Sequence, residues 1–502
     1  MKIVDSATMA SIDSRSQQEF AYPSILLMEN AGIKSYQSFK SFIGGDQKLT
    51  NKRILFLAGK GNNGGDALVM ARQCFLEGYT PEVVLYRDEL QGDPLINRNI
   101  NEKLGIPLID YHKNRDEALR AIEKADILFD GLTGTGIKGE LKGEMKDLVN
   151  RINSISKKFT VAIDVPSGIS DDFKDRFTAV KADLTLTMGL PKKCLYLPAA
   201  RKLCGTIKVI PLGFPPQLVA DPLIPGELLL WEEFKEKIPP IADDTYKNRR
   251  GSLAIFAGYP GTTGAAVLSS FSAARSRAGL VTLFADSEIY KTLAAKMTSV
   301  MVRPWKGDSN PKDCDLSPFN AILAGPGWGI KPDRIKWIQH FIGSGLPGVL
   351  DADGLTMLAE IIVKGELRLD GRWILTPHPG EFCRLAGIKR DVLFEDPVDH
   401  VLHLCRKLEA VIVLKSHITV VGNPEGNYWI LDGMNPAMAT GGSGDVLAGI
   451  IAGFLAGGLR PTLSACAGVL LHHRIGKRAF REKGWFISED LLLYISEEIP
   501  KN

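Results

Sequence analysis

The chain carries almost no net charge. Its 502 residues hold 61 basic and 58 acidic side chains, which gives a formal charge of +3. Proteins that bind nucleic acids offset the charge of the phosphates with a basic surface, so this balance argues against a nucleic-acid partner. The apolar fraction of 45% is also too high for a disordered chain. We therefore expect a folded protein that acts on small molecules.

Long apolar runs and processing signals are missing as well. The longest apolar run, 446–459, is shorter than the about 20 residues that a membrane-spanning helix needs. Residues 1–6 show no basic segment followed by an apolar one. We expect neither a secretory signal nor a membrane partner.

Cysteine and histidine patterns that cross-link a chain or bind zinc are absent. The seven cysteines are scattered and form no C-x-x-C pair, which is typical of a reducing compartment and predicts a cytoplasmic location. Two close histidine pairs, His400 with His403 and His472 with His473, have no third ligand at a zinc-like spacing. Neither pair is therefore expected to hold a metal.

Glycine, in contrast, is abundant. The chain has 50 glycines, about a tenth of its residues, against roughly 7% in ordinary proteins. They cluster after apolar runs, where glycine allows tight turns and a close approach of the backbone to a ligand. The clusters therefore predict ligand-binding loops.

Short apolar runs alternate with helical periodicity in both halves of the chain. In the first half they lie at 54–58, 82–86, 127–130 and 161–165, and they predict a Rossmann-like three-layer α/β/α domain over residues 1–215. A proline-rich linker or strap is predicted at 216–244. A second series of runs predicts another α/β domain over 245–502, with an antiparallel pair at 411–422 and a helical end.

Polar side chains follow several of the predicted strands in the first half. Gly59, Gly61 and Gly64 formally match the G-x-G-x-x-G fingerprint of dinucleotide-binding proteins, but the neighbouring side chains supply carboxamide and carboxylate oxygens. Asp130 and Asp164 each end an apolar strand directly before a glycine-bearing loop. Helix capping would explain either aspartate alone, whereas three such loops at one sheet edge predict a ligand site.

Four motifs in this half, at 27–32, 61–66, 164–168 and 188–193, resemble the NAD(P)H-hydrate epimerase domain. The resemblance places Asp164 at the reacting centre, where a hydroxyl at C6 of the reduced nicotinamide ring must leave and return, with Lys192 or Lys193 balancing its charge. It implies a K⁺ ion held by three oxygen-bearing side chains, those of Asn63, Asp130 and Ser167. The residues implied to contact the hydrated dinucleotide, besides Asp164, are Asn62, Asn63, Gly64, Gly65, Asp66, Gly134, Thr135, Gly136, Ile137, Lys138, Gly139 and Glu140.

The second half contains a glycine-rich segment, 439–445, directly before a predicted helix of small residues at 446–459. Successive backbone N–H groups at such a helix start suit a phosphoryl group in transfer, and Asp445 is placed to take a proton from an acceptor hydroxyl. A capping turn would explain one serine or aspartate but not the cluster. No G-x-x-x-x-G-K-[ST] string occurs, so the protein is not expected to be a P-loop enzyme.

This helix start is similar to that of ribokinase-like kinases. Five further strings, at 258–265, 324–329, 350–354, 376–382 and 415–419, resemble the ADP-dependent NAD(P)H-hydrate dehydratase domain, over about residues 225–500. The resemblance implies that Asp445 is the base and that Mg²⁺ takes part, with Asp351, Asp353 and Glu381 as outer-sphere candidates. The implied hydrate contacts are Ala265, Gly327, His378 and Asp445, and the implied ADP contacts are Lys415, Ser416, His417, Ile418, Thr419 and Gly444.

The chain departs from the family pattern at three positions. Tyr246 and Asn248 stand where a histidine and a glycine are usual, and Ser416 follows the nucleotide lysine in place of glycine. The role of the 245–251 loop is therefore open. We expect nucleotide binding to survive because serine is small.

The sequence thus predicts a bifunctional metabolite-repair enzyme, an isomerase and a lyase. It would exchange the R and S hydrates of NADH and NADPH (NADHX and NADPHX) and dehydrate the S form at the expense of ADP, as a homo-oligomer that uses K⁺ and Mg²⁺. Two alternatives stay open: an NAD-dependent oxidoreductase, which would leave the second half idle, and a ribokinase-like small-molecule kinase fused to a non-catalytic binding module.

Overall fold

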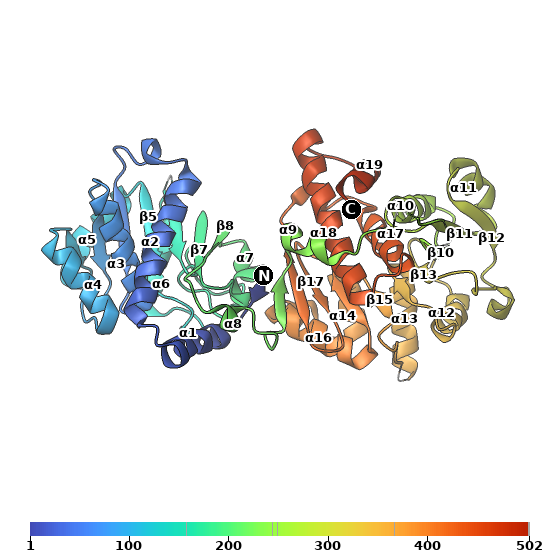
Figure 1. The fold of residues 1–502 in the computed structure, drawn as a ribbon, viewed down its shortest axis with the longest axis horizontal. Helices are drawn as coiled ribbons and strands as arrows, with labels where there is room; N and C mark the ends of the chain where they lie inside the picture. Colours follow the sequence, from blue (N-terminus) through green and yellow to red (C-terminus); the bar gives the residue numbers. More distant parts are fainter. Residues whose placement is uncertain (157, 243, 248, 366, 500–502) are drawn as a thin grey trace. The chain divides into compact units, whose positions relative to one another are not determined.

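The computed structural model describes residues 1–156, 158–242, 244–247, 249–365 and 367–499. The chain divides into two compact units (Figure 1). The N-terminal unit comprises Lys2–Ile224, and the C-terminal unit comprises Pro225–Asn502 together with Met1. Each unit is built around its own sheet, so the predicted α/β fold class is confirmed.

The sheet of the N-terminal unit has the strand order β4-β3-β2-β5-β6-β7-β8, and all neighbours in it are parallel. Its central strands are buried at nearly every residue because helices cover both faces. The strands are β2 (Ile54–Ala58), β3 (Glu82–Leu85), β4 (Leu108–Asp110), β5 (Ile127–Gly131), β6 (Phe159–Ile163), β7 (Leu184–Met188) and β8 (Thr206–Ile210), and a short β1 (Lys2–Ile3) precedes them.

Alternate residues of the central strands build two separate cores. Phe56 and Phe129 stack at 4.3 Å between ring centroids, on the face that also buries Phe39. Leu55 and Leu128 point to the opposite core. Helices supply both outer layers, as the three-layer prediction requires: α1 (Ser6–Phe20), α2 (Ser24–Ile43), α3 (Asn62–Leu76), α4 (Gly92–Lys103), α5 (Arg115–Lys124), α6 (Gly143–Ser154), α7 (Pro198–Arg201) and α8 (Pro216–Val219).

The sheet of the C-terminal unit contains the strand order β9-β18-β17-β16-β15-β14-β13-β10-β11-β12. It is parallel from β12 to β16, and the predicted antiparallel pair at 411–422 is confirmed as β16 and β17. Strand β9 lies within the segment predicted as a linker and pairs with β18. The strands are β9 (Gly226–Leu228), β10 (Ser252–Phe256), β11 (Leu280–Asp286), β12 (Met301–Trp305), β13 (Ala321–Ala324), β14 (Gly348–Leu350), β15 (Trp373–Leu375), β16 (Val411–Leu414), β17 (Ile418–Gly422) and β18 (Tyr428–Asp432).

The helix of small residues forms the centre of the C-terminal unit. It is α17, which is buried from Val446 to Ala456. A Cβ on Gly449 would lie 2.0 Å from Ser272 Oγ, so this glycine lets α17 pack closely against α10. The helices are α9 (Trp231–Phe234), α10 (Thr263–Arg275), α11 (Tyr290–Lys296), α12 (Asp333–Gly343), α13 (Asp353–Lys364), α14 (Pro379–Ala386), α15 (Arg390–Glu395), α16 (Pro397–Leu408), α17 (Ser443–Ala456), α18 (Pro461–Lys483) and α19 (Ser488–Glu498).

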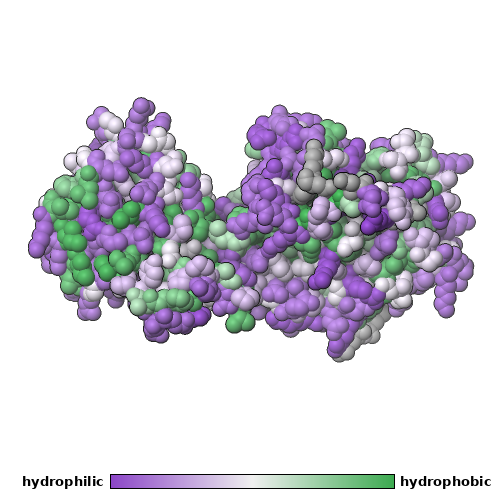
Figure 2. Space-filling view, in the orientation of Figure 1, coloured by the Kyte–Doolittle hydropathy of each residue, from purple (hydrophilic) through white to green (hydrophobic). Residues whose placement is uncertain are grey.

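The visible surface is largely hydrophilic, with scattered hydrophobic patches (Figure 2). Leu95, Ile96 and Ile100 are exposed on α4. In the described part of the chain, no helix combines the length and the apolar character needed to cross a membrane. All seven cysteines are free thiols.

Candidate active sites

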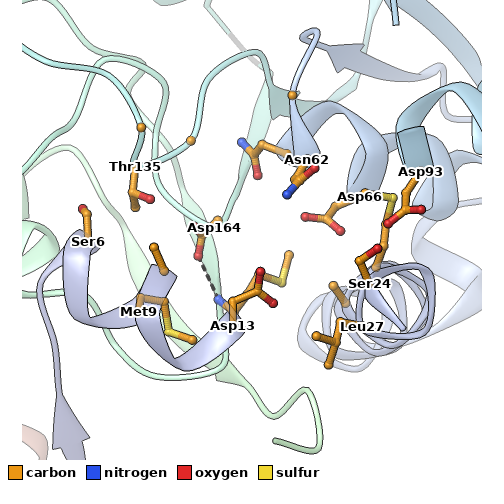
Figure 3. Close-up of a pocket in the computed structure, with 18 of the residues that line it drawn as sticks. Ser6, Met9, Asp13, Ser24, Leu27, Asn62, Asp66, Asp93, Thr135 and Asp164 are labelled. Carbon is orange, nitrogen blue, oxygen red and sulfur yellow. Dashed lines mark hydrogen bonds between the residues drawn. The ribbon is translucent and has the colours of Figure 1, made fainter. Parts of the chain in front are cut away.

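The N-terminal unit contains a cavity of about 840 Å³ at the carboxyl ends of its central strands (Figure 3). Helices α1, α2 and α3 and the loops after β5, β6 and β7 line it. The cavity brings together many of the residues singled out in the sequence: Asn62, Asn63, Asp66, Gly134, Thr135, Gly136, Ile137 and Asp164. The expectation that ligand-binding side chains gather at this sheet edge thus has a structural basis.

Asp164 follows β6 directly and has a φ of +64°, in the left-handed region that few non-glycine residues adopt. Its Oδ1 accepts a hydrogen bond from Met188 N at 3.0 Å and lies 2.5 Å from Lys192 Nζ. Lys192 is 1% exposed, so its ammonium group is taken out of water and held by this carboxylate. The structure therefore gives the predicted charge-balancing role to Lys192.

Three oxygen-bearing side chains lie beside the cavity in a hydrogen-bonded group. Ser167 donates to Asp130 through both its Oγ, at 2.6 Å, and its backbone N, at 2.8 Å. Asn63 Nδ2 donates to Thr133 O at 2.9 Å, whereas Asn63 Oδ1 is buried without a hydrogen-bond partner. Burial raises the pKa of the Asp130 carboxyl to about 6. An unpartnered buried oxygen next to a buried carboxyl fits an oxygen-coordinated cation such as K⁺.

Several residues implied to contact the dinucleotide do not line the cavity. Gly64 and Gly65 pack instead, since a Cβ would lie 1.9 Å from Gly59 O and 2.6 Å from Met28 Sδ respectively. In the loop after β5, Gly139 N donates to the carboxylate of Asp172. The neighbouring residue, Glu140, forms an ion pair with Lys146 at 2.6 Å, and Lys138 also lies outside the lining.

Helix α1 contributes cavity residues that the sequence did not indicate. Met9 and Asp13 both line the cavity. They precede every glycine-rich motif, and no local pattern distinguishes Asp13 from an ordinary surface aspartate. Only the packing of α1 over the carboxyl ends of the strands reveals its place.

In the C-terminal unit, a charged group forms where β14, β15 and β16 end. Lys415 Nζ lies 2.6 Å from Asp351 Oδ1, which also accepts a hydrogen bond from Thr376 Oγ1 at 2.8 Å. Asp351 is 1% exposed. Although burial alone would lower the pKa of Lys415, the carboxylates of Asp351 and Glu381 raise it. The lysine is therefore charged and can bind a phosphate.

The glycine-rich start of α17 lies against this group. A Cβ on Gly444 would be 3.4 Å from Lys415 Nζ. Gly442 caps the helix with a φ of +88°, and in the described structure the backbone N–H groups of Gly444 and Asp445 donate to no acceptor. Burial and the nearby carboxylate of Asp351 raise the pKa of Asp445 to about 7. Free N–H groups, a lysine and a poised carboxyl are what a phosphoryl-transfer site needs.

A second part of this site is the loop 325–329 after β13. A Cβ on Gly327 would lie 2.9 Å from Ala265 Cβ, so two of the implied hydrate contacts adjoin. Thr262 Oγ1 donates to Gly327 O at 2.8 Å, and Gly329 N donates to Asp353 Oδ2 at 2.8 Å. The loop is therefore held at its middle, Gly327, and at its end, Gly329.

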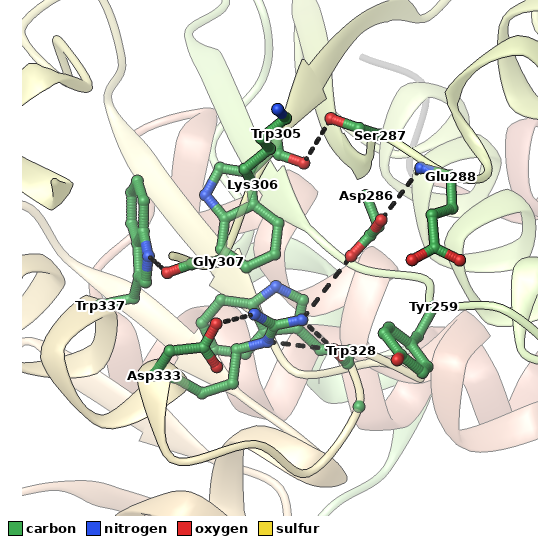
Figure 4. A network of polar contacts seen from close by, with 12 residues as sticks. Tyr259, Asp286, Ser287, Glu288, Trp305, Lys306, Gly307, Trp328, Asp333 and Trp337 are labelled. Atoms are coloured by element: carbon green, nitrogen blue, oxygen red, sulfur yellow. Dashed lines mark hydrogen bonds and ion pairs between the residues drawn. The ribbon is translucent and has the colours of Figure 1, made fainter. Parts of the chain in front are cut away.

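Buried Arg334 anchors the same loop, in the polar network of which Trp305, Trp328 and Asp333 are labelled in Figure 4. Its Nε and Nη2 both donate to Trp328 O at 3.3 Å. The guanidinium carbon lies 4.4 Å from the ring centroid of Trp305 and 5.2 Å from that of Trp328, and Asp333 supplies the countercharge at 3.0 Å. This cation–π arrangement fixes the backbone of the loop.

His378 is positioned by helix capping. Its Nδ1 accepts from Gly380 N at 3.0 Å, while Glu381 Oε2 accepts from His378 N at 2.8 Å. The two residues thus form a reciprocal cap at the start of α14. The side chain of His378 is 57% exposed, and its Nε2 lies 3.4 Å from Glu381 Oε1.

The remaining implied nucleotide contacts lie on the turn from β16 to β17. Ser416 Oγ lies 3.2 Å from His417 Nδ1, and Thr419 Oγ1 donates to Ser416 O at 3.0 Å. Tyr246 is 63% exposed, and Asn248 lies outside the described residues. No cluster of three His, Cys, Asp or Glu side chains able to hold a metal occurs among the described residues. Asp353 and Glu381, two of the predicted outer-sphere Mg²⁺ candidates, accept hydrogen bonds from Gly329 N and His378 N.

Comparison with known proteins covers both units. Residues 253–501 match the family model described as NAD(P)H-hydrate dehydratase, and residues 24–194 match that of the YjeF-related protein N-terminus. The bifunctional NAD(P)H-hydrate repair enzyme Nnr of Moorella thermoacetica is 34% identical over 503 residues, which cover 96% of this chain and 93% of that protein. Its counterpart from Coxiella burnetii is 34% identical over 436 residues, or 86% and 87% of the two chains.

Among solved structures, the ADP/ATP-dependent NAD(P)H-hydrate dehydratase of Bacillus subtilis, co-crystallised with ATP and Mg²⁺, is 25% identical. It covers 54% of this chain and 99% of its own, with a TM-score of 0.49. The full-length matches to curated relatives are decisive because they span both units at over 30% identity. The chain belongs to the family of bifunctional NAD(P)H-hydrate repair enzymes.

Proposed function

We propose that the N-terminal unit exchanges the R and S hydrates of NADH and NADPH and that the C-terminal unit dehydrates the S hydrate, with ADP converted to AMP and phosphate. One observation carries this division of labour. Each unit holds a lysine against an aspartate at the carboxyl ends of its strands, and in the C-terminal unit this lysine lies against the glycine-rich start of α17, where the N–H groups of Gly444 and Asp445 have no acceptor among the described residues. Family membership favours this function over an NAD-dependent oxidoreductase.

In the N-terminal unit, Asp164 acts on the hydroxyl at C6 of the hydrate. Its contact with Lys192 keeps the carboxylate in one orientation and neutralises its charge within the cavity. Asn62 and the loop 134–137, which line the same cavity, hold the dinucleotide. Asn63, Asp130 and Ser167 would hold K⁺, whose positive charge supports the buried carboxyl of Asp130 and orders the loop after β5.

In the C-terminal unit, Asp445 takes the proton of the C6 hydroxyl as its oxygen attacks the terminal phosphorus of ADP. The bond between that phosphorus and the bridging oxygen breaks, and AMP leaves. Lys415 and the N–H groups of Gly444 and Asp445 face the charge of the phosphoryl group in transfer. Loss of phosphate from C6, with a proton from C5, restores the double bond of the reduced nicotinamide.

We also propose a cytoplasmic homo-oligomer. The free state of all seven cysteines suits a reducing compartment. The exposed side chains of Leu95, Ile96 and Ile100 on α4 would be covered by association. Light scattering of the purified chain should give a mass above that of one 54.8 kDa chain. A single-chain mass would contradict this part of the proposal.

The function is tested by incubating the purified chain with mixed R and S hydrates, ADP, Mg²⁺ and K⁺. Recovery of the absorbance of reduced nicotinamide should reach the total of both epimers, and AMP should appear in equal amount. Reactions without ADP serve as the control and should recover nothing while the epimers still equilibrate. If both epimers persist in the presence of ADP, the proposed function is wrong.

A further inference from the structure

Two carboxyl groups in the cavity of the N-terminal unit have very different surroundings. Oδ1 of Asp164 accepts hydrogen bonds from Lys192 Nζ, from Met188 N and, at 3.4 Å, from Thr187 Oγ1. Asp66, in the first turns of α3, is only 8% exposed, yet no hydrogen-bond donor among the described residues reaches its carboxyl group. A carboxylate buried without a donor or a cation is costly, so Asp66 is the group that must give up its charge.

Two neighbouring carboxylates add to the effect of burial on the pKa of Asp66. Burial raises its pKa well above the usual range, the carboxylates of Asp164 and Asp13 raise it further, and Lys192 opposes them. Asp13, which faces the cavity from α1, keeps a hydrogen bond from Gln17 Nε2 at 3.1 Å. The other charged groups around the cavity and on the α2 side of α3 are Lys60, Asp93 and the ion pair of Glu29 with Arg72.

We infer that Asp66 carries a proton at neutral pH and is the general acid for the C6 hydroxyl, while Asp164, held by Lys192, is the base. Figure 3 shows the two carboxyl groups reaching the cavity from different elements, α3 and the loop after β6. Enzymes that use one carboxyl group as an acid and another as a base usually place the two in different surroundings, which favour the protonated form of one and the ionised form of the other. The inference rests on the proposed epimerase function and adds a role to a residue implied only to bind.

The step balances as follows. The bond between C6 and the hydroxyl oxygen breaks, the lone pair of the ring nitrogen forms a double bond to C6, and the proton of Asp66 completes the departing water. A water then adds to the other face of C6, the electron pair returns to the nitrogen, and Asp164 takes the proton that this water loses. Exchange with solvent protons restores the acid form of Asp66 and the carboxylate of Asp164 for the next turnover.

The test is Asp66→Asn in the full chain, assayed for R/S exchange without ADP. Asparagine keeps a neutral hydrogen-bond donor in the cavity but cannot transfer a proton, so kcat should fall at least about 100-fold while KM changes less than about threefold. Asp147→Asn, which removes an exposed carboxylate on α6, is the matched control and should keep the exchange rate. A raised KM with an unchanged kcat would reduce Asp66 to a binding residue and overturn the inference.

The pH profile gives a second, independent readout. Exchange by the wild type should fall as the pH rises through the pKa of Asp66, because the acid must be protonated. Asp13→Asn removes a negative charge and should move this alkaline limb to lower pH. A limb that does not move overturns the inference, whereas a wild type that exchanges no epimers at any pH would instead refute the proposed function.

Discussion

The two units use the same device for different ends. In each, a lysine in the loop after one strand pairs with an aspartate directly after another: Lys192 after β7 with Asp164 after β6, and Lys415 after β16 with Asp351 after β14. Under the proposed function, the paired aspartate of the N-terminal unit is itself the reacting group. In the C-terminal unit the paired aspartate, Asp351, instead helps to raise the pKa of Asp445, the carboxyl proposed to react. Both lysines therefore balance the charge of a carboxylate, but only in the N-terminal unit is that carboxylate the one proposed to react.

The reason lies in what each reaction must stabilise. Exchange of a hydroxyl needs an acid and a base but no site for an anion, and the cavity offers several carboxyl groups. Phosphoryl transfer needs positive charge and free N–H groups for the phosphate, and these stand at the start of α17 beside Lys415. A similar sheet edge thus supports both reactions through the residues that its loops add.

The largest difference between the two pairs should appear in stability. Lys415→Met leaves the carboxyl of Asp351, which is 1% exposed, without its countercharge and should lower the free energy of unfolding of the C-terminal unit by about 3–5 kcal/mol. Lys192→Met should cost the N-terminal unit less, because the Asp164 side chain is 16% exposed and keeps its hydrogen bond from Met188 N. Hydrogen exchange read separately for each unit measures both losses. Equal losses would show that the two pairs are energetically alike.

Potassium should stabilise only the N-terminal unit. With K⁺ at 100 times its dissociation constant, linkage predicts about 2.7 kcal/mol of added stability in the wild type. Asn63→Leu removes the unpartnered Oδ1 and should abolish the increase. The readout is the melting temperature in potassium chloride against choline chloride of equal ionic strength. The assigned ligand set would be wrong if the variant gained as much stability from K⁺ as the wild type.

The two activities should depend on pH in opposite ways. Asp445 must be ionised to act as a base, and its pKa is raised to about 7, so kcat/KM for dehydration should fall roughly tenfold for each pH unit below that value. Exchange in the N-terminal unit should instead weaken as the pH rises. Initial rates of both reactions in one buffer series measure the two limbs. A dehydration rate that is constant from about pH 5 to 7 would remove Asp445 as the titrating base.

The smallest expected effect concerns the loop behind the hydrate. Arg334→Lys keeps a positive charge near Asp333 but loses the double hydrogen bond to Trp328 O. The KM for the S hydrate should rise roughly tenfold with kcat nearly unchanged, since the loop positions substrate without touching the transferred phosphate. Exchange by the N-terminal unit is the internal control. A loss in kcat alone would show that Arg334 does not act through the loop.

Local pattern predicted the strands better than the sites. Strands β13 and β16 begin and end where their apolar runs do. Strand β12 instead contains Arg303 and Pro304, because this edge strand is set by pairing with β11 rather than by its own residues. Strand β9 could not be foreseen, since its three residues are defined only by pairing with β18, about 200 positions along the chain.

The site residues, like the strands, could be predicted only where a local pattern identifies them. Strand-end aspartates and glycine-rich loops carry a local signature, so Asp164 and Asp445 could be singled out from the sequence. The helix predicted at 446–459 is α17, which begins at Ser443, because Gly442 adopts the left-handed conformation that caps it. Asp13 and the unpartnered state of Asp66 depend on packing between distant elements, which no local pattern encodes.

The central claim is that two separate sites act in series on one substrate pool. It is tested most directly by giving mixed hydrates and ADP to Asp164→Ala and Asp445→Asn in parallel and following each epimer by chromatography. Asp164→Ala should consume the S hydrate and leave the R hydrate, whereas Asp445→Asn should exchange both epimers and recover no reduced cofactor. If Asp164→Ala consumed both epimers at the wild-type rate, or if Asp445→Asn still released AMP, the account would be contradicted.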